Sequence, residues 1–206
     1  MGKLIFILLL LQSTFVFALS KKGAFQSTKI GAIQQNYTGT DKQSFSGGSP
    51  AYGVELSIDS GGQYFRYFFK TRIMNSIGSQ NFIKSGTTYF SKYDFTSIEP
   101  EIGVALFPVS RNDKGVNIYL WALANVSYNN LTINSPPAGL GISNKSQEFG
   151  AGFGGGLGVE LIAFTTRGGK RLLLYSEVGF RDSRAPLAGI SNFEVSGMTA
   201  SLGFGF

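Results

Sequence analysis

The chain has 206 residues, among them 28 glycines and 19 phenylalanines, and only 15% of its residues are charged. It contains no cysteine and no histidine, so disulfides, thiolate zinc sites, imidazole metal ligands and the usual general base are excluded. The formal net charge of +6 comes from scattered Lys and Arg residues, without the basic cluster that nucleic-acid binding requires.

The first twenty residues, MGKLIFILLLLQSTFVFALS, have the pattern of a secretory signal peptide. A basic Lys3 precedes an apolar run over residues 4–11, and small residues follow near Ala18. The apolar run is shorter than the roughly 20 residues that a membrane-spanning helix needs. We therefore predict a signal peptide over residues 1–18, cleaved after Ala18, and one exported domain over residues 19–206.

Apolar and polar residues alternate along most of the remaining sequence. In AYGVELSID, for example, the apolar residues are Tyr52, Val54, Leu56 and Ile58, each followed by a polar residue or glycine. The same alternation recurs in YFRYFFKTRI, VNIYLWALANVSY, LLLYSEVGF and GMTASLGFGF. A period of two is typical of β-strands with one apolar face.

Turn-forming residues separate these strands by connections of two kinds. The short connections are DSGG, PVSRNDKG and TRGGK. The longer ones cover Thr38–Pro50, Asn75–Thr88, Asn129–Gln147 and Asp182–Asn192. About eight strands joined by alternating short and long links are typical of transmembrane barrels, with the short turns in the periplasm. The predicted fold is all-β, a closed antiparallel transmembrane β-barrel with an up-and-down meander.

The composition of the polar rows favours this barrel over a soluble β-sandwich. A sandwich would point its charged face into water, whereas these rows carry few charges and many glycines, as a narrow lumen would. Backbone groups in lipid must all be paired, so strands cross a membrane only as a closed barrel. Pro100 interrupts one strand between Glu99 and Glu101, and because proline cannot donate a ladder bond, we expect a β-bulge there.

Two glycine hairpins predict strand register, because facing residues have a constant sum of residue numbers and lie on the same side of the sheet. A reversal at the SG of DSGG would place Glu55 opposite Arg66. A reversal at the GG of TRGGK would place Glu160 opposite Glu177. Both pairings would point into the lumen.

The last ten residues, GMTASLGFGF, resemble the C-terminal targeting signal of Gram-negative outer-membrane proteins. The row that carries this resemblance is Met198, Ala200, Leu202, Phe204 and Phe206. With the signal peptide, the alternation and the loop rhythm, the chain resembles the small eight-stranded barrels of the OmpA membrane-domain, OmpX and OmpW type. The resemblance implies a monomer in the outer membrane, in contact with lipid and inserted by the outer-membrane assembly machinery.

Charged residues on the inward faces are expected to form a network of ion pairs. They are Glu55, Arg66, Lys70, Arg72, Glu99, Glu101, Glu160 and Glu177. Charges in a narrow lumen must pair or lose their charge, so the network would plug the barrel. The alternative interpretation is a gate or a proton-linked conduit.

Two facing carboxylates, Glu160 and Glu177, could also act as the acid and base of a glycosidase. A basic residue that reaches between them, such as Arg66, is the simpler expectation, because the sequence gives no sign of a cleft that would admit a glycan. Asp41, Asp182 and Glu194 lack the ligand spacing of a calcium site. We expect no enzyme activity, no cofactor and no metal.

A second set of inward residues is apolar and comprises Tyr64, Phe68, Tyr119, Trp121 and Leu123. Packing inside the lumen is one interpretation, and a pocket or conduit for small apolar molecules of the OmpW kind is the other. The long connections are rich in Ser, Asn, Gly and Thr, and they either contact an extracellular partner or are inert. The sequence thus predicts an envelope-structural or surface-interaction role, with an apolar conduit as the alternative.

The stretch EFGAGFGGGLGVE contains the G-x-G-x-x-G spacing that elsewhere holds a dinucleotide phosphate. That site needs a helix after the glycines, and here the strand pattern continues through LGVELIAF. We instead predict a bare inner stripe of Gly150, Gly152, Gly154, Gly156 and Gly158. Glycine within a strand marks close approach by another group. The expected occupants are Tyr64, Phe68, Tyr119 and Trp121, or else a ligand or water.

Overall fold

The computed structural model describes residues 25–38, 49–84, 87–112, 114–134, 144–165, 171–187 and 190–206. These residues form β1 (Phe25–Tyr37), β2 (Ala51–Gly61), β3 (Phe65–Lys84), β4 (Thr87–Leu106), β5 (Gly115–Asn134), β6 (Lys145–Thr165), β7 (Arg171–Leu187), β8 (Ile190–Glu194) and β9 (Gly197–Gly205). The predicted signal peptide, residues 1–18, lies outside the described residues. Within the described part of the chain, no helix is long and apolar enough to cross a membrane.

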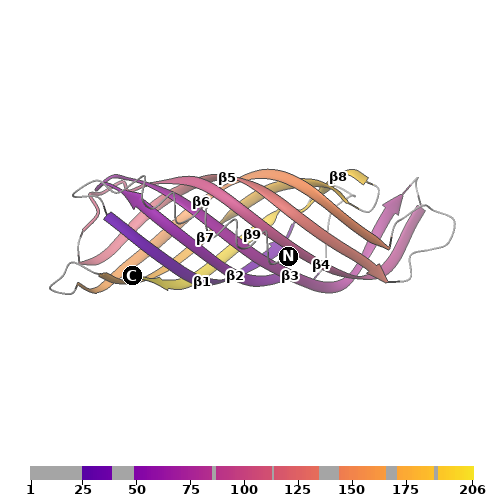
Figure 1. Cartoon of the computed structure of the whole chain (residues 1–206), viewed down its shortest axis with the longest axis horizontal. Coiled ribbons are helices and arrows are strands. Elements are labelled where there is room, and N and C mark those ends of the chain that lie inside the picture. Colours follow the sequence, from indigo (N-terminus) through magenta and orange to yellow (C-terminus); the bar gives the residue numbers. More distant parts are fainter. Residues whose placement is uncertain are drawn as a thin grey trace.

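The strands close into a ring of antiparallel neighbours, tilted relative to the long axis (Figure 1). Each strand from β1 to β7 pairs with the next, and β9 pairs with both β7 and β1. β8 continues the β9 strand, because Glu194 of β8 faces Arg184 of β7 in the same register as Gly197 of β9 faces Arg181. The described residues therefore form an eight-stranded antiparallel barrel, and the predicted fold class is confirmed.

The barrel has two unlike ends. The turn end carries the β2–β3, β4–β5 and β6–β7 connections, together with the start of β1 and the end of β9. The loop end carries the β1–β2, β3–β4, β5–β6 and β7–β8 connections. At the turn end, β2 and β3 reverse over residues 62–64, where the Gly62 N–H donates to the Phe65 carbonyl at 2.8 Å.

Several predicted long loops are largely strand. β3 continues to Lys84 and β4 begins at Thr87, so the predicted loop over 75–88 is the far part of a hairpin. Most of the predicted loop over 182–192 belongs to β7 and β8. The predicted loop over 129–147 is reduced to residues 135–144, because β5 extends to Asn134 and β6 begins at Lys145. The fourth, over 38–50, falls mostly outside the described residues. The prediction was wrong because it interpreted a polar outer surface as irregular structure.

The predicted register of both short hairpins is also wrong. Glu55 faces Arg72 rather than Arg66, and Glu177 faces Gly158 rather than Glu160. Both partners are displaced by an even number of residues, which keeps every side chain on its own side of the sheet. The glycines mislead because the β2–β3 ladder extends through Gly61, and the reversal begins only after it.

Pro100 does not produce the expected bulge. It faces Thr71 of β3, and β4 pairs with β5 in one constant register on both sides of it, with Ile98 facing Tyr128 and Glu101 facing Asn125. The β4–β5 ladder skips Glu99 and Pro100 without an extra residue. The missing N–H of proline is therefore absorbed by a short gap in pairing.

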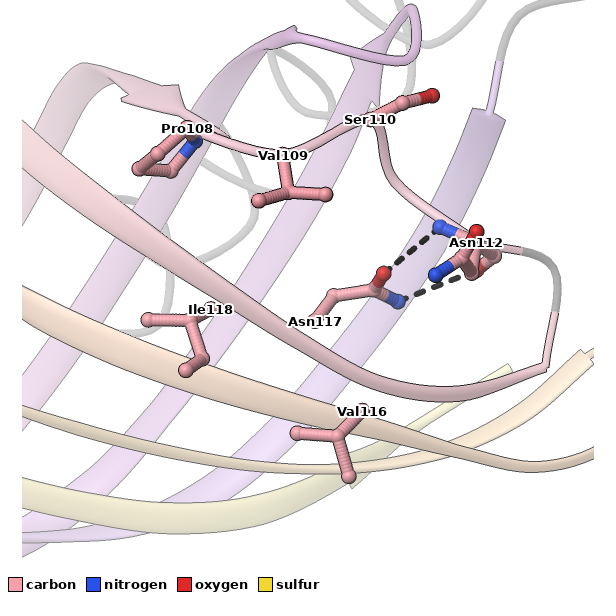
Figure 2. A pocket seen from close by; sticks show the side chains of 7 residues that line it. All are labelled: Pro108, Val109, Ser110, Asn112, Val116, Asn117 and Ile118. Carbon is pink, nitrogen blue, oxygen red and sulfur yellow. Dashed lines mark hydrogen bonds between the residues drawn. The ribbon is translucent and has the colours of Figure 1, made fainter.

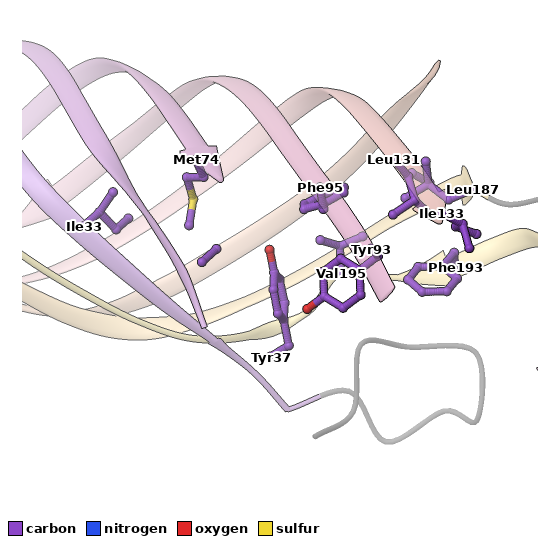
Figure 3. Packing of buried hydrophobic residues seen from close by; sticks show 12 residues of the cluster. Ile33, Tyr37, Met74, Tyr93, Phe95, Leu131, Ile133, Leu187, Phe193 and Val195 are labelled. Carbon is purple, nitrogen blue, oxygen red and sulfur yellow. The ribbon is translucent and has the colours of Figure 1, made fainter. Parts of the chain in front are cut away.

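The polarity of the strands inverts along the barrel. On β5, the outward residues from Val116 to Val126 are apolar, whereas Asn130 and Thr132 nearer the loop end are polar and alternate with buried Leu131 and Ile133. The same inversion occurs on other strands, and the inward apolar residues at the loop end form one cluster (Figure 3). This loop-end cluster consists of Ile33, Tyr37, Ala51, Met74, Tyr93, Phe95, Leu131, Ile133, Ala185, Leu187, Phe193 and Val195.

The inversion indicates where the membrane ends. An outward apolar band matches lipid, and outward polar residues over an apolar interior match water, as in a soluble protein. The turn-end part of the barrel is thus the membrane-spanning part, and the loop-end part projects beyond it.

Candidate functional site

The lumen of the membrane-spanning part holds a network of buried charges. Among the described residues it joins six carboxylates and six basic side chains, which we call the lumen network. Its members are Lys29, Glu55, Asp59, Arg66, Lys70, Arg72, Glu99, Glu101, Arg111, Glu160, Glu177 and Arg181. Equal numbers of opposite charges allow each ion to be compensated without water.

Arg66 is the hub of the network near the turn end. Its Nη1 lies 3.0 Å from Glu160 Oε2 and 3.2 Å from Asp59 Oδ2. Lys29 of β1 lies 2.8 Å from the same Asp59 oxygen, and Arg111 from the β4–β5 turn donates to Glu160. The Arg66 guanidinium also stacks over the Tyr119 ring, 4.3 Å from its centre. Five strands and one turn are tied together here.

The middle of the lumen continues the network with alternating charges. Lys70 Nζ lies 2.6 Å from Glu177 Oε2 and 3.5 Å from Glu55 Oε2. Arg72 Nε then donates to Glu55 at 3.1 Å and lies 3.5 Å from Glu101.

Two tyrosines and one further arginine complete this layer. Tyr175 donates its hydroxyl proton to Glu55 at 2.8 Å, and Tyr119 donates to Glu177 at the same distance. Arg181 of β7 donates to Glu101 and lies 3.4 Å from Glu99, so the network reaches from β2 across to β7.

All eight charged residues named from the sequence lie in this network, but four further members were missed. Lys29 is on β1, whose faces the sequence left unassigned, and Arg111 comes from a connection. Arg181 lies between the predicted strand LLLYSEVGF and the predicted loop that begins at Asp182, so it was assigned to neither. Asp59 was placed on the polar face but not among the charged set. A simple signal existed for Asp59 and Arg181: each has the residue-number parity of the inward row on its own strand.

The predicted partners within the network change with the register. Arg66 does not bind Glu55, and Glu160 does not face Glu177 directly. Arg66 instead lies between Glu160 and Glu177, with its Nη2 4.0 Å from Glu177 Oε1. A basic side chain therefore separates the two carboxylates, which leaves them without the open gap for substrate that a glycosidase requires.

The glycine stripe of β6 is covered by the inward row of β5, residue for residue. The facing pairs are Tyr119 with Gly158, Trp121 with Gly156, Leu123 with Gly154, Asn125 with Gly152 and Ser127 with Gly150. A Cβ at Gly156 would lie 2.8 Å from the Trp121 ring, and one at Gly150 would lie 2.7 Å from the Ser127 hydroxyl. Both would also meet backbone atoms of β7. The stripe is bare because neighbouring side chains occupy its surface.

One predicted lumen residue is misplaced and another covers a different glycine. Tyr64 lies in the β2–β3 turn and is 57% exposed, so it does not line the lumen as expected. The sequence prediction extended the alternation of β3 one residue too far, past its first residue Phe65. Phe68 is buried and lies against Gly103 of β4, where a Cβ would come within 2.3 Å of its ring.

Apolar and aromatic groups occupy the lumen on both sides of the lumen network. Toward the loop end, Ser97 donates to Glu99 at 2.9 Å, and the loop-end cluster begins just beyond, with Phe95 on the same strand. Toward the turn end, Phe25 is buried between the guanidinium groups of Arg111 and Arg171, 4.7 and 4.2 Å from its ring centre. These layers can exclude solvent and fix the barrel shape.

The acidic residues and the C-terminal row were also singled out from the sequence. No group of three or more acidic residues among them could hold a metal ion. The carboxylates of the lumen network are each held by basic groups or hydroxyls and lie buried. The C-terminal row of Met198, Leu202, Phe204 and Phe206 points outward from the barrel.

Solved structures with a similar fold are small outer-membrane barrels. The outer membrane protein OprG from Pseudomonas aeruginosa aligns with a TM-score of 0.57 and 14% identity, covering 90% of this chain and 95% of that one. Ail, the attachment invasion locus protein of Yersinia pestis, aligns with a TM-score of 0.48 and 12% identity, covering 90% of this chain and 100% of that one. Neisserial surface protein A aligns with a TM-score of 0.45 and 13% identity, covering 89% of this chain and 97% of that one. No protein-family model and no curated protein matches the sequence. The likeness to OprG establishes the fold.

Proposed function

We propose that the chain is an integral protein of a Gram-negative outer membrane with a sealed lumen, serving envelope integrity or surface contacts rather than catalysis or transport. The observation that carries this proposal is the stacking of the lumen network and the loop-end cluster along one barrel axis. A continuous water path would have to break both layers. The outward apolar band and the fold shared with OprG support the membrane location.

Export and insertion would use the two ends of the chain. Residues 1–18 would direct secretion and be removed after Ala18. The row of Met198, Ala200, Leu202, Phe204 and Phe206 would be read by the assembly machinery before β9 closes the barrel. The loop end would then face outward from the cell, because it carries the β1–β2 and β5–β6 connections, the two longest in sequence, and the long connections of such barrels are extracellular.

A surface-contact role is supported by the β3–β4 hairpin. The ladder between these strands continues to Lys84 and Thr87, whereas pairing of β3 with β2 ends at Asn75 and pairing of β4 with β5 ends at Lys92. Within the described residues, the far part of the hairpin therefore has no strand neighbour on either side. Open strand edges accept extended segments of other proteins through backbone hydrogen bonds.

A conduit for small apolar molecules, the alternative function, has less support. Trp121 and Leu123 are buried against the glycine stripe, and the Trp121 indole N–H donates to the Leu157 carbonyl at 3.2 Å. An apolar solute could enter this layer only by displacing those side chains. Trp121 fluorescence that responds saturably to a panel of apolar compounds would favour the conduit.

Planar-bilayer conductance tests the sealed lumen. We expect negligible conductance for the wild-type protein and also for Glu55→Gln and Arg66→Ala, with folding of each checked by heat-modifiable gel migration. Reproducible conductance steps of the wild type would overturn the seal. A closed wild type with an open Arg66→Ala variant would instead indicate a gate built from the lumen network.

Shortening the β3–β4 hairpin tests the surface role. Residues 79–92 can be replaced by an Asn-Gly turn, because Gly78 and Tyr93 face each other and a two-residue turn fits that pairing. We expect the variant to fold, to remain non-conducting and to lose binding to cells or surface ligands that the wild type binds. Full binding by the shortened protein would exclude the hairpin as the contact site.

A further inference from the structure

A groove on the outer surface at the turn end is not explained by the sealed lumen. It lies between the β4–β5 turn and β5 and has a volume of about 410 Å³. Figure 2 shows Val109 and Ser110 on the turn above the strand, with Val116 and Ile118 on the strand below them. Val109, Val116 and Ile118 are all more than half exposed, with Val109 at 75%.

The turn that forms the upper wall is held in place by Asn117. The Asn112 N–H donates to Asn117 Oδ1 at 2.7 Å, and Asn117 Nδ2 donates back to the Asn112 carbonyl at 3.1 Å (Figure 2). The Arg111 N–H donates to the Gln63 carbonyl at 2.8 Å, which ties the turn to the β2–β3 turn. The groove is thus preformed.

A second hollow lies farther along the same face of β5. It has a volume of about 430 Å³ and is lined by Ala122 and Ala124 together with Tyr67, Ile102 and Val104 of the neighbouring strands. Ile118 and Ala122 belong to one outward row of β5, with Leu120 between them. At the usual strand rise, the two positions are about 13 Å apart. Both hollows therefore lie along one apolar track that tilts with the strand.

The chemistry of the track fits a membrane lipid. Its apolar part is continuous with the outward apolar band, so acyl chains would surround it once the barrel is inserted in a membrane. Its turn-end rim is polar, with Ser110 and Asn112 in the lining and the exposed Lys114 on the same turn. An amphipathic occupant would place an apolar chain along β5 and a charged headgroup at the turn.

We propose that one phospholipid of the leaflet at the turn end binds specifically along this track. Its phosphate-bearing headgroup lies at Ser110 and Lys114, and one acyl chain runs over Val116 and Ile118 toward the hollow at Ala122. The proposal depends on membrane insertion of the barrel but not on whether the lumen conducts. A lipid held in this way would fix the orientation of the turn relative to the membrane surface.

The test is lipid retention by the purified full-length protein. The protein is extracted, delipidated stepwise in detergent, supplied with phosphatidylethanolamine or phosphatidylglycerol, and examined by native mass spectrometry. Ala122→Phe fills the distal hollow, and Lys114→Gln removes the charge at the rim. Ala32→Phe is the matched control, because Ala32 is an outward alanine of β1 in the same apolar band. Heat-modifiable migration confirms that each variant is folded.

We expect the wild type and Ala32→Phe to retain one lipid under conditions that remove the others. Ala122→Phe and Lys114→Gln should each lower the bound fraction of both lipids. For Ala122→Phe the apparent affinity should fall by roughly tenfold. Inorganic phosphate should not displace the lipid. Equal retention by the wild type and Ala122→Phe would overturn the acyl-chain track. Loss of every lipid from the wild type would overturn the site altogether, without bearing on the sealed lumen.

Discussion

Tyr119 lies directly over Gly158, its partner across the β5–β6 ladder, so closely that a Cβ at Gly158 would come within 2.3 Å of the tyrosine ring. The same ring stacks with the Arg66 guanidinium, and its hydroxyl donates to Glu177. A glycine on one strand therefore makes room for an aromatic side chain that connects to the lumen network. The glycine stripe and the ion pairs are parts of one packing arrangement.

Replacing Gly158 with alanine should destabilise the barrel. The added methyl group would overlap the Tyr119 ring, and overpacking of a tight interior costs about 1–3 kcal/mol. Unfolding by denaturant in detergent, followed by Trp121 fluorescence, measures the change. The control is Gly155→Ala on the outward face, where a Cβ would meet only the Trp121 carbonyl at 3.3 Å. In a Tyr119→Ala background, Gly158→Ala should cost less than it does in the wild type, because the overlapping ring is gone. Equal stability of the wild type and Gly158→Ala would contradict this account.

Removing Arg66 should be among the most damaging single changes in the lumen. Arg66→Ala leaves Asp59 and Glu160 buried with fewer positive partners, and breaking a buried ion pair from one side costs about 3–5 kcal/mol. Equilibrium unfolding in lipid or detergent measures the loss. Arg184→Ala is the comparison, because Arg184 pairs with Asp182 on the exposed surface at 3.8 Å and should change stability by less than about 1 kcal/mol. Similar losses for the two variants would argue against an interior ionic scaffold.

The position of the membrane boundary can be tested on one face of one strand. Leu120→Arg places a charge in the apolar band and should cost about 2–4 kcal/mol, whereas Thr132→Arg lies on the same face of β5 beyond the inversion and should cost about 1 kcal/mol or less. Unfolding in lipid vesicles gives both values. Equal costs for both arginines would mean that the polarity inversion does not mark the edge of the bilayer.

The loop-end cluster should behave as a soluble hydrophobic core. Phe95 is buried and lies edge-on to Tyr37, with ring centres 6.3 Å apart, so Phe95→Ala should cost about 3–5 kcal/mol. Phe153→Ala, an outward residue of the membrane band, should cost clearly less because the lost contacts are with lipid. Denaturant unfolding compares the two. If Phe153→Ala lowers the free energy of unfolding more than Phe95→Ala does, the loop-end cluster does not act as a stabilising core of the projecting part.

Processing of the N-terminus provides an independent test of export. Intact-mass measurement of the protein purified from outer membranes should show a chain that begins at residue 19, because cleavage is expected after Ala18. Substituting Ala18 with Lys should block cleavage and reduce the amount in the outer-membrane fraction. A mature chain that retains residues 1–18 would overturn the signal-peptide prediction.

Strand faces could be predicted from local sequence because they depend only on residue parity. Glu55, Arg66, Glu160 and Glu177 were assigned inward on that basis, and they are buried in the lumen. The predicted registers of the two hairpins were wrong for these same residues. A shift by an even number of residues changes the partner across the ladder but leaves the alternation of faces unchanged. Local pattern therefore restricts which way a side chain points but not which partner it meets.

The sequence by itself determined the all-β class, the strand faces of the membrane-spanning part other than those of β1, and an interior rich in charge and glycine, because these follow from a period of two and from composition. Only the tertiary structure decided that Arg181 meets Glu101 across 80 positions of sequence, that Tyr119 and Trp121 cover Gly158 and Gly156, and that the loop-end strands turn apolar inward. These features depend on ring closure and on the register between neighbouring strands. Both are long-range properties that no single strand encodes.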